Sequence, residues 1–263
     1  GGGSENQATC INTVVGGGFQ NTASSYFAVI AGGEQQVASG NRSSIVGGTA
    51  NIASGDYTFI GGGALNEAQC LVNTISGGCS NAITANYGTV GGGYNNEISG
   101  AVGTISGGGS NEILGTTSTI GGGFKNYVSA TATCSTIAGG CFNTTCGTWS
   151  TIGGGAQNVA HCTKSTIGGG VANIACGDCS TISGGYGNTT GDNNTTVSGG
   201  SGNRAFCNDS VISGGCNNRT NAQTSTISGG YANYIEGRNS VITGGVNNNA
   251  CCRANFIGGG NSN

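Results

Sequence analysis

A 15-residue repeat runs through this chain and limits what the chain can fold into. The string Ile/Val-x-Gly-Gly-x-x-Asn, with Gln in place of Asn in one copy, occurs 17 times in 263 residues, and successive copies lie 15 residues apart except for one step of 17. With the Ile or Val as position 1, the repeat reads I-x-G-G-x-x-N-x-(A/I/V)-x-(G/C)-x-x-S-T. The Gly pair never changes, and Gln36 is the one replacement of the Asn at position 7. Repeats built from helix pairs need more than about 30 residues, so this period excludes them.

The pattern within each repeat favours two short strands joined by Gly-rich turns. Ser150 and Ile152 lie on one side of a strand and Thr151 on the other, while Asn158 and Ala160 share one side of a second strand. Stacking such repeats gives an all-β, single-domain parallel β-solenoid, or β-roll, of about 17 coils. We expect one continuous domain over residues 1–263, with a two-residue insertion near 130–133.

The repeated Asn predicts a structural ladder along the solenoid. Each side-chain amide can bond to the same amide in the next coil and cap a turn. The expected ladder consists of Asn21, Asn51, Asn66, Asn81, Asn96, Asn111, Asn126, Asn143, Asn158, Asn173, Asn188, Asn203, Asn218, Asn233 and Asn248. Gly makes up 57 of the 263 residues and is costly to order, so we expect self-association to add stability.

Composition argues against several function classes. Seven Lys and Arg residues, with a net charge of -3, provide no basic stripe for nucleic acid. No apolar run approaches the ~18 residues of a membrane span. One His and scattered carboxylates leave little for acid–base catalysis, so we expect no enzyme and no cofactor. Cys176 and Cys179 form an isolated C-x-x-C, which is weak evidence for metal, and His161 and Cys162 should face opposite sides of a strand.

Two known groups of proteins have similar repeats. The stretch from Asn111 to Gly123, N-x-I-x-G-x-x-S-T-I-G-G-G, resembles the head repeats of trimeric autotransporter adhesins and related Gly/Asn-rich surface or tail-fibre β-roll proteins. The resemblance implies a left-handed β-roll, a homotrimer, and a stiff stalk or adhesive head outside a cell or on a cell, phage or virion surface. The chain departs from the adhesins in its doubled Gly and in its Cys residues at turns.

A second resemblance is to the ice-binding β-solenoids of grasses and insects, which also use Gly, Asn and Thr. An outward rank of Thr at position 15 is the feature that an ice-binding face requires, although β-branched columns are also common where sheets pack together. The rank consists of Thr74, Thr89, Thr104, Thr119, Thr136, Thr151, Thr166, Thr181 and Thr196. We favour a packing interface over ice for this rank.

The 13 Cys residues fall only at positions 5, 10, 11 and 13 of the repeat. Disulfides between neighbouring coils would be worth ~2–4 kcal/mol each in an oxidising compartment, and the alternative is small thiols in place of Gly or Ser. We expect the pairs Cys70 with Cys79, Cys207 with Cys216 and Cys162 with Cys176. An odd count leaves at least one thiol outside such pairs.

These observations together predict a structural, non-enzymatic fibre or adhesin segment that forms a rigid extracellular or surface rod. The alternative is an ice-binding solenoid. The expected partners are further copies of the chain, as a homotrimer or as an end-to-end fibre, because no polar capping repeat is recognisable. Aromatic residues at positions 5 and 13, among them Phe19, Tyr57 and Trp149, could bind a glycan or receptor or could cover the turns.

Overall fold

In the computed structural model, which describes residues 2–263, the chain forms a parallel β-solenoid of about 17 coils with a 15-residue repeat, so the predicted fold class is confirmed. All strands are two residues long, and no helix occurs in the described part of the chain. It therefore contains no helix that could cross a membrane. The chain divides into two compact units, Gly1–Ala130 and Thr131–Asn263, and the predicted insertion falls at this division.

In both units, odd-numbered strands hold positions 8 and 9 of the repeat and even-numbered strands hold positions 15 and 1. The odd strands of the first unit are β1 (Gln7–Ala8), β3 (Thr22–Ala23), β5 (Val37–Ala38), β7 (Ile52–Ala53), β9 (Glu67–Ala68), β11 (Ala82–Ile83), β13 (Glu97–Ile98), β15 (Glu112–Ile113) and β17 (Tyr127–Val128). Its even strands are β2 (Val14–Val15), β4 (Val29–Ile30), β6 (Ser44–Ile45), β8 (Phe59–Ile60), β10 (Thr74–Ile75), β12 (Thr89–Val90), β14 (Thr104–Ile105) and β16 (Thr119–Ile120).

The second unit has the same construction. Its even strands are β18 (Thr136–Ile137), β20 (Thr151–Ile152), β22 (Thr166–Ile167), β24 (Thr181–Ile182), β26 (Thr196–Val197), β28 (Val211–Ile212), β30 (Thr226–Ile227), β32 (Val241–Ile242) and β34 (Phe256–Ile257). Its odd strands are β19 (Thr144–Thr145), β21 (Val159–Ala160), β23 (Ile174–Ala175), β25 (Thr189–Thr190), β27 (Arg204–Ala205), β29 (Arg219–Thr220), β31 (Tyr234–Ile235) and β33 (Asn249–Ala250).

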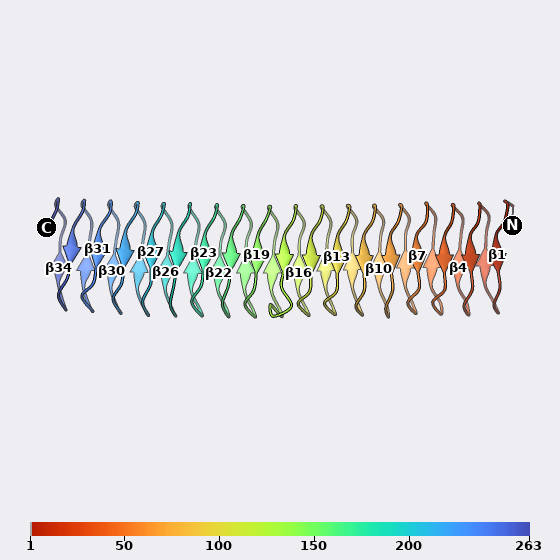
Figure 1. Ribbon diagram of the computed structural model, residues 1–263, viewed down its shortest axis with the longest axis horizontal. Helices are drawn as coiled ribbons and strands as arrows, with labels where there is room; N and C mark the ends of the chain where they lie inside the picture. Colours follow the sequence, from red (N-terminus) through yellow and green to blue (C-terminus); the bar gives the residue numbers. More distant parts are fainter. Residues whose placement is uncertain (1) are drawn as a thin grey trace. The chain divides into compact units, whose positions relative to one another are not determined.

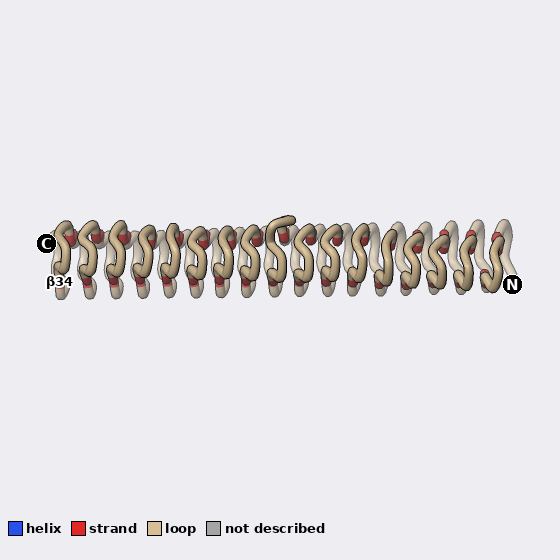
Figure 2. The backbone as a smooth tube through the Cα atoms, turned by 90° about the horizontal axis from the view of Figure 1, so that it is seen from below, coloured by secondary structure: helices blue, strands red, loops and turns tan. Residues whose placement is uncertain are grey.

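Within each unit, equivalent strands of successive coils pair in parallel and in register (Figure 1). Thr74 faces Thr89, for example, and Ile75 faces Val90. Figure 2 shows the short strands in rows joined by the turns. A further row of parallel backbone bridges runs along position 5, as between Phe19 and Glu34. The 15-residue period thus brings each repeat position into a column of identical positions.

A narrow core fills each coil. The Ile or Val at position 1 is fully buried in most coils, and a residue at position 9, usually Ala or Ile, packs beside it. Where position 9 is large, position 14 can be small: a Cβ on Gly88 would lie 2.5 Å from Ile83 Cγ2, and one on Gly103 would lie 2.7 Å from Ile98 Cγ2. Gly at position 14 therefore offsets Ile at position 9, because a close-packed interior leaves no spare volume.

The second Gly of the invariant pair is required by both backbone angle and space. Gly63 has φ of +87°, and a Cβ added there would collide with the carbonyl oxygen of Gly78 in the next coil. Only Gly adopts this conformation without strain, which explains why position 4 never varies.

Positions 6 and 13 are also left-handed, yet they are seldom Gly. Tyr57, Val102 and Trp149 at position 13 have φ of 58°, 59° and 56°. The N–H of Tyr57 donates to the Asn41 carbonyl of the preceding coil at 2.8 Å, and that of Val102 donates to Asn86 at 2.9 Å. This coil-to-coil bond holds large residues in a conformation that costs roughly 1–2 kcal/mol per residue.

Candidate functional site

The Asn residues at position 7 form a buried hydrogen-bonded ladder in each unit. Asn66 is fully buried, and its Nδ2 donates to Gly62 O at 3.0 Å and to Gly78 O at 2.9 Å. Nδ2 also lies 3.1 Å from Asn51 Oδ1. In turn, Asn81 N and Nδ2 donate to Asn66 Oδ1 at 3.1 and 3.0 Å. Each amide therefore joins three successive coils, and all of the asparagines named for the ladder are fully buried.

Gln36 interrupts this ladder in the first unit. Its N–H donates to Asn21 Oδ1 and its Oε1 accepts from Asn51 N, both at 3.0 Å. Its Nε2 is buried and has no hydrogen-bond partner in the structure. The longer Gln side chain therefore still accepts a hydrogen bond from the next coil, but its amide NH2 no longer donates one.

A second, shorter ladder, which the repeat pattern did not predict, runs along position 12. Asp56 Oδ1 accepts the Asn41 N–H at 2.9 Å. In the second unit, Asp178 Oδ1 accepts the Thr163 N–H at 3.0 Å, and Asn193 Oδ1 accepts the Asp178 N–H at 3.1 Å. The signal in the sequence was the recurrence of Asn or Asp at this position in scattered repeats.

All 13 cysteines are free thiols, so the predicted disulfides are wrong. Cys70 lies between β9 and β10, whereas Cys79 lies between β10 and β11, so a strand separates the two. Strand β28 separates Cys207 from Cys216 in the same way. A separation of nine residues therefore places the two cysteines of each pair in different turns of the coil. Their closeness in sequence does not make them neighbours in space.

The third predicted pair, Cys162 and Cys176, lies in equivalent turns of adjacent coils but is also unbonded. Burial raises the pKa of the Cys162 thiol, and Asp178, Cys176 and Cys146 raise it further. Burial raises the pKa of Cys176 as well. Both thiols therefore remain protonated at neutral pH, which lowers their reactivity.

His161 and Cys162 do not face opposite sides of a strand, so this expectation from the sequence is wrong. Cys162 Sγ lies 3.8 Å from His161 Nδ1, because both residues follow the end of β21 and the strand alternation no longer applies. No group of three or more His, Cys, Asp or Glu residues among residues 2–263 is arranged to hold a metal ion.

The threonines of position 15 form two in-register rows, one in each unit. Thr74, Thr89, Thr104 and Thr119 pair successively in the first unit. The row of the second unit consists of Thr136, Thr151, Thr166, Thr181 and Thr196. Thr89 and Thr151 are exposed and the others are half-buried. Position 2 beside these rows carries only Gly, Ala or Ser, so each row lies on a flat face.

Several aromatic side chains of the turns stack with cations from neighbouring coils. The Arg42 guanidinium carbon lies 5.4 Å from the Phe27 ring centre and 5.3 Å from that of Tyr57. Lys164 Nζ lies 5.6 Å from the Trp149 ring. These contacts run along the columns and stabilise exposed rings by about 0.5–1 kcal/mol each.

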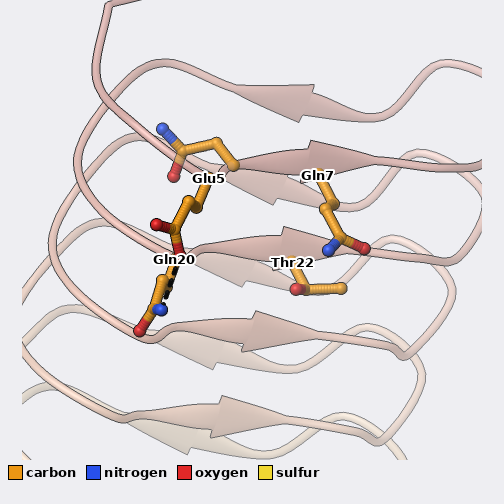
Figure 3. Close-up of a pocket in the computed structure, with 5 residues that line it drawn as sticks. Glu5, Gln7, Gln20 and Thr22 are labelled. Carbon is orange, nitrogen blue, oxygen red and sulfur yellow. Dashed lines mark hydrogen bonds between the residues drawn. The ribbon is translucent and has the colours of Figure 1, made fainter.

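A shallow depression on the first coils is lined by Glu5, Asn6, Gln7, Gln20 and Thr22. Figure 3 shows Glu5 beside Gln20, whose Nε2 donates to Glu5 Oε2 at 2.6 Å. The carboxylate is thus held by a neutral amide, and the remaining lining offers amides and a hydroxyl. Such groups suit hydrogen bonding to a polar surface.

The outward side chains of the odd strands are charged in opposite senses in the two units. Glu97 and Glu112 are stacked on β13 and β15 of the first unit, and Arg204 and Arg219 are stacked on β27 and β29 of the second. Burial and the Glu97 carboxylate raise the pKa of Glu112. Arg219 Nε donates to Asn221 Oδ1 at 2.9 Å.

A search of known protein families finds no match to this chain, and a search of curated proteins finds no similar protein.

Proposed function

We propose that this chain is a structural, non-enzymatic fibre or adhesin segment that forms a rigid rod outside a cell or on a cell, phage or virion surface. The ladder at position 7 carries the proposal. In each unit, buried Asn amides and parallel backbone bonds run from coil to coil, as at Asn66 and Asn81. Bending a coil away from its neighbour would break several of these bonds together, so each unit resists bending.

The surface of the repeats is consistent with this role. The turns expose aromatic rings such as Tyr57, Tyr87 and Trp149, about half of whose surface is accessible. Rings of this kind bind glycans and protein surfaces through their apolar faces. The resemblance of the repeat to adhesin head repeats supports an extracellular location and a homotrimer, in which the exposed side chains would contact other copies or a receptor.

Electron microscopy of the purified protein tests the proposal. At ~4.8 Å per coil, each unit should be about 40 Å long and much narrower than it is long. Elongated particles whose units do not bend are the expected result. Globular particles, or units that curve freely between images, would overturn the proposal.

Ice binding is a second candidate function, and the in-register Thr rows favour it. Threonines aligned on successive coils recur every ~4.8 Å on a flat parallel sheet, which presents hydroxyl and methyl groups in a regular array. Position 15 also holds valines and phenylalanines next to the Thr rows, such as Phe59 beside Thr74 and Val211 beside Thr196. Such apolar side chains suit a protein interface equally well.

Thermal hysteresis measurements separate the two uses of the Thr rows. For ice binding, the wild type should show hysteresis, and Thr104→Lys with Thr166→Lys should abolish it. Glu34→Lys, outside the rows, is the matched control and should retain the activity. A wild-type protein without hysteresis would eliminate ice binding and leave the fibre proposal unaffected.

A further inference from the structure

The outward face of the odd strands carries two stacked charge pairs of opposite sign. We call Glu97 and Glu112 the acidic pair and Arg204 and Arg219 the basic pair. Each pair occupies position 8 of two adjacent coils, in parallel register. The two pairs therefore have the same internal spacing of ~4.8 Å, set by the strand separation.

Neither pair has an opposite charge in direct contact in the described part of the chain. Glu236 is linked to Arg219 only indirectly, because Asn221 donates to the Tyr234 hydroxyl at 2.9 Å and that hydroxyl donates to Glu236 at 2.8 Å. Among residues 2–263, no ion pair involves any of these four side chains. Glu97 accepts a 3.3 Å hydrogen bond from Ser99 Oγ, and Arg219 is held by Asn221. Like charges directly opposite one another on adjacent strands are destabilising. Repulsion within each pair would be relieved by a partner that carries the opposite pair.

The two units also differ in net charge beyond these four residues. The first unit has two Lys or Arg residues and six Asp or Glu residues, a net charge of -4. The second has five and four, a net charge of +1. On the odd-strand face of the first unit, Glu67 adds a third carboxylate, and no Lys or Arg occupies position 8 or 10 there.

We propose that two copies of this chain associate laterally, with the acidic pair of one copy bound to the basic pair of another. The partner is a second copy because the chain itself supplies both charge pairs at the same spacing. The contact deepens the proposed fibre role, on which it rests for its biological meaning, by naming a surface through which rods would bundle.

The residues on either side of the pairs favour an antiparallel contact. Arg219 is preorganised for it, since its guanidinium carbon lies 5.3 Å from the Phe206 ring centre and 5.7 Å from that of Tyr234. In a parallel alignment, Tyr127 would face Tyr234, the largest side chains of both rows. An antiparallel alignment sets each tyrosine against a small residue. It pairs Ala82 with Tyr234, Glu97 with Arg219, Glu112 with Arg204 and Tyr127 with Thr189.

Charge reversal tests the contact. Sedimentation velocity of the full chain at about 20 mM salt should show association that weakens on the order of tenfold or more at about 500 mM, because salt screens exposed charges. Glu97→Arg/Glu112→Arg and Arg204→Glu/Arg219→Glu should each reduce self-association to a similar degree. A mixture of these two variants should associate, and the chain with all four reversals should regain the wild-type behaviour.

The control is Glu34→Arg/Asp209→Arg, which makes the same change in net charge as Glu97→Arg/Glu112→Arg but alters exposed turn residues at positions 5 and 13, outside the odd strands. It should associate like the wild type, and unchanged circular dichroism would show that all variants are folded. Equal loss in the control, no association in the mixture, or a wild type that is monomeric at low salt would overturn the proposal. Particles that are monomeric yet elongated in the microscope would refute the lateral contact alone.

Orientation is tested by photo-crosslinking. A p-benzoylphenylalanine placed at Thr189 should crosslink between copies to the strand that holds Tyr127. A crosslink to the strand that holds Ala82 would show a parallel contact and overturn the antiparallel arrangement.

Discussion

Replacing Gln36 with Asn should stabilise the first unit. Gln36 is the one residue of position 7 that is not Asn, and its buried Nε2 lacks an acceptor. In the next coil, Asn51 Nδ2 donates to Gly47 O at 3.1 Å and to Gly63 O at 3.0 Å. An Asn at position 36 would reach the equivalent carbonyls, those of the glycines four residues before it and twelve after it.

The magnitude follows from two opposing terms. A buried donor without an acceptor costs about 1–3 kcal/mol. Shortening Gln to Asn removes one buried methylene, a loss of about 0.8 kcal/mol. The Gln36→Asn variant should therefore gain about 1 kcal/mol in the free energy of unfolding.

Urea denaturation followed by circular dichroism measures this gain as a higher midpoint at unchanged slope. The matched control is Asn66→Gln, which would leave the same kind of unbonded amide in an intact part of the ladder and, by the same two terms, should lose about 1 kcal/mol. If Gln36→Asn is neutral or destabilising while Asn66→Gln is destabilising, then the unbonded amide is not the cause of a local weakness and the reasoning fails.

Three further predictions concern single side chains. Thr145 Oγ1 is buried without a partner, so Thr145→Val should raise the unfolding free energy by about 1 kcal/mol. Thr190→Val should lower the unfolding free energy, because Thr190 Oγ1 bonds to Ser180 Oγ at 3.0 Å. Equal shifts of the urea midpoint in the two variants would contradict this reasoning. Val102 has φ of 59° and is half exposed, so Val102→Asn should gain about 0.5–1 kcal/mol in the same assay, and a loss would show that the strain is absent. The pKa of Glu112 is raised above its usual 4.5 by burial and Glu97, so its charged form is disfavoured in the folded state and its contribution to stability falls as pH rises through that value. Glu112→Gln should therefore be more stable than the wild type at pH 7 and equal to it below about pH 3.5 in melting experiments, and a difference of the opposite sign at pH 7 would refute the assignment.

The sequence alone predicted the solenoid and its period because the positions that define them tolerate few residue types. Position 4 needs Gly for its positive φ and its contact with the next coil, as at Gly63. Position 1 must fill the core, and the short Asn side chain fits the turn at position 7. Restricted chemistry at fixed spacing was therefore visible in one sequence.

Other features left weaker signals. The left-handed turns at position 13 hold Phe27, Tyr57 and Val102, residues that ordinarily avoid this conformation, because a backbone bond to the preceding coil holds them there. The disulfide prediction failed for a different reason. Spacing along the chain says how far apart two cysteines are in sequence, but strand β10 places Cys70 and Cys79 in different turns.

The ladder has a consequence for how such a gene can change. Asn66 receives its bonds from the coil after it and gives its own to the coil before it, to its own turn and to the coil after it. Loss or gain of 15 residues inside a unit would reconnect the same donors with the same acceptors, since every interior coil offers an equivalent pair of surfaces. Unequal recombination between repeats can therefore lengthen or shorten the protein by whole coils. Its length can then change during evolution while the fold stays the same.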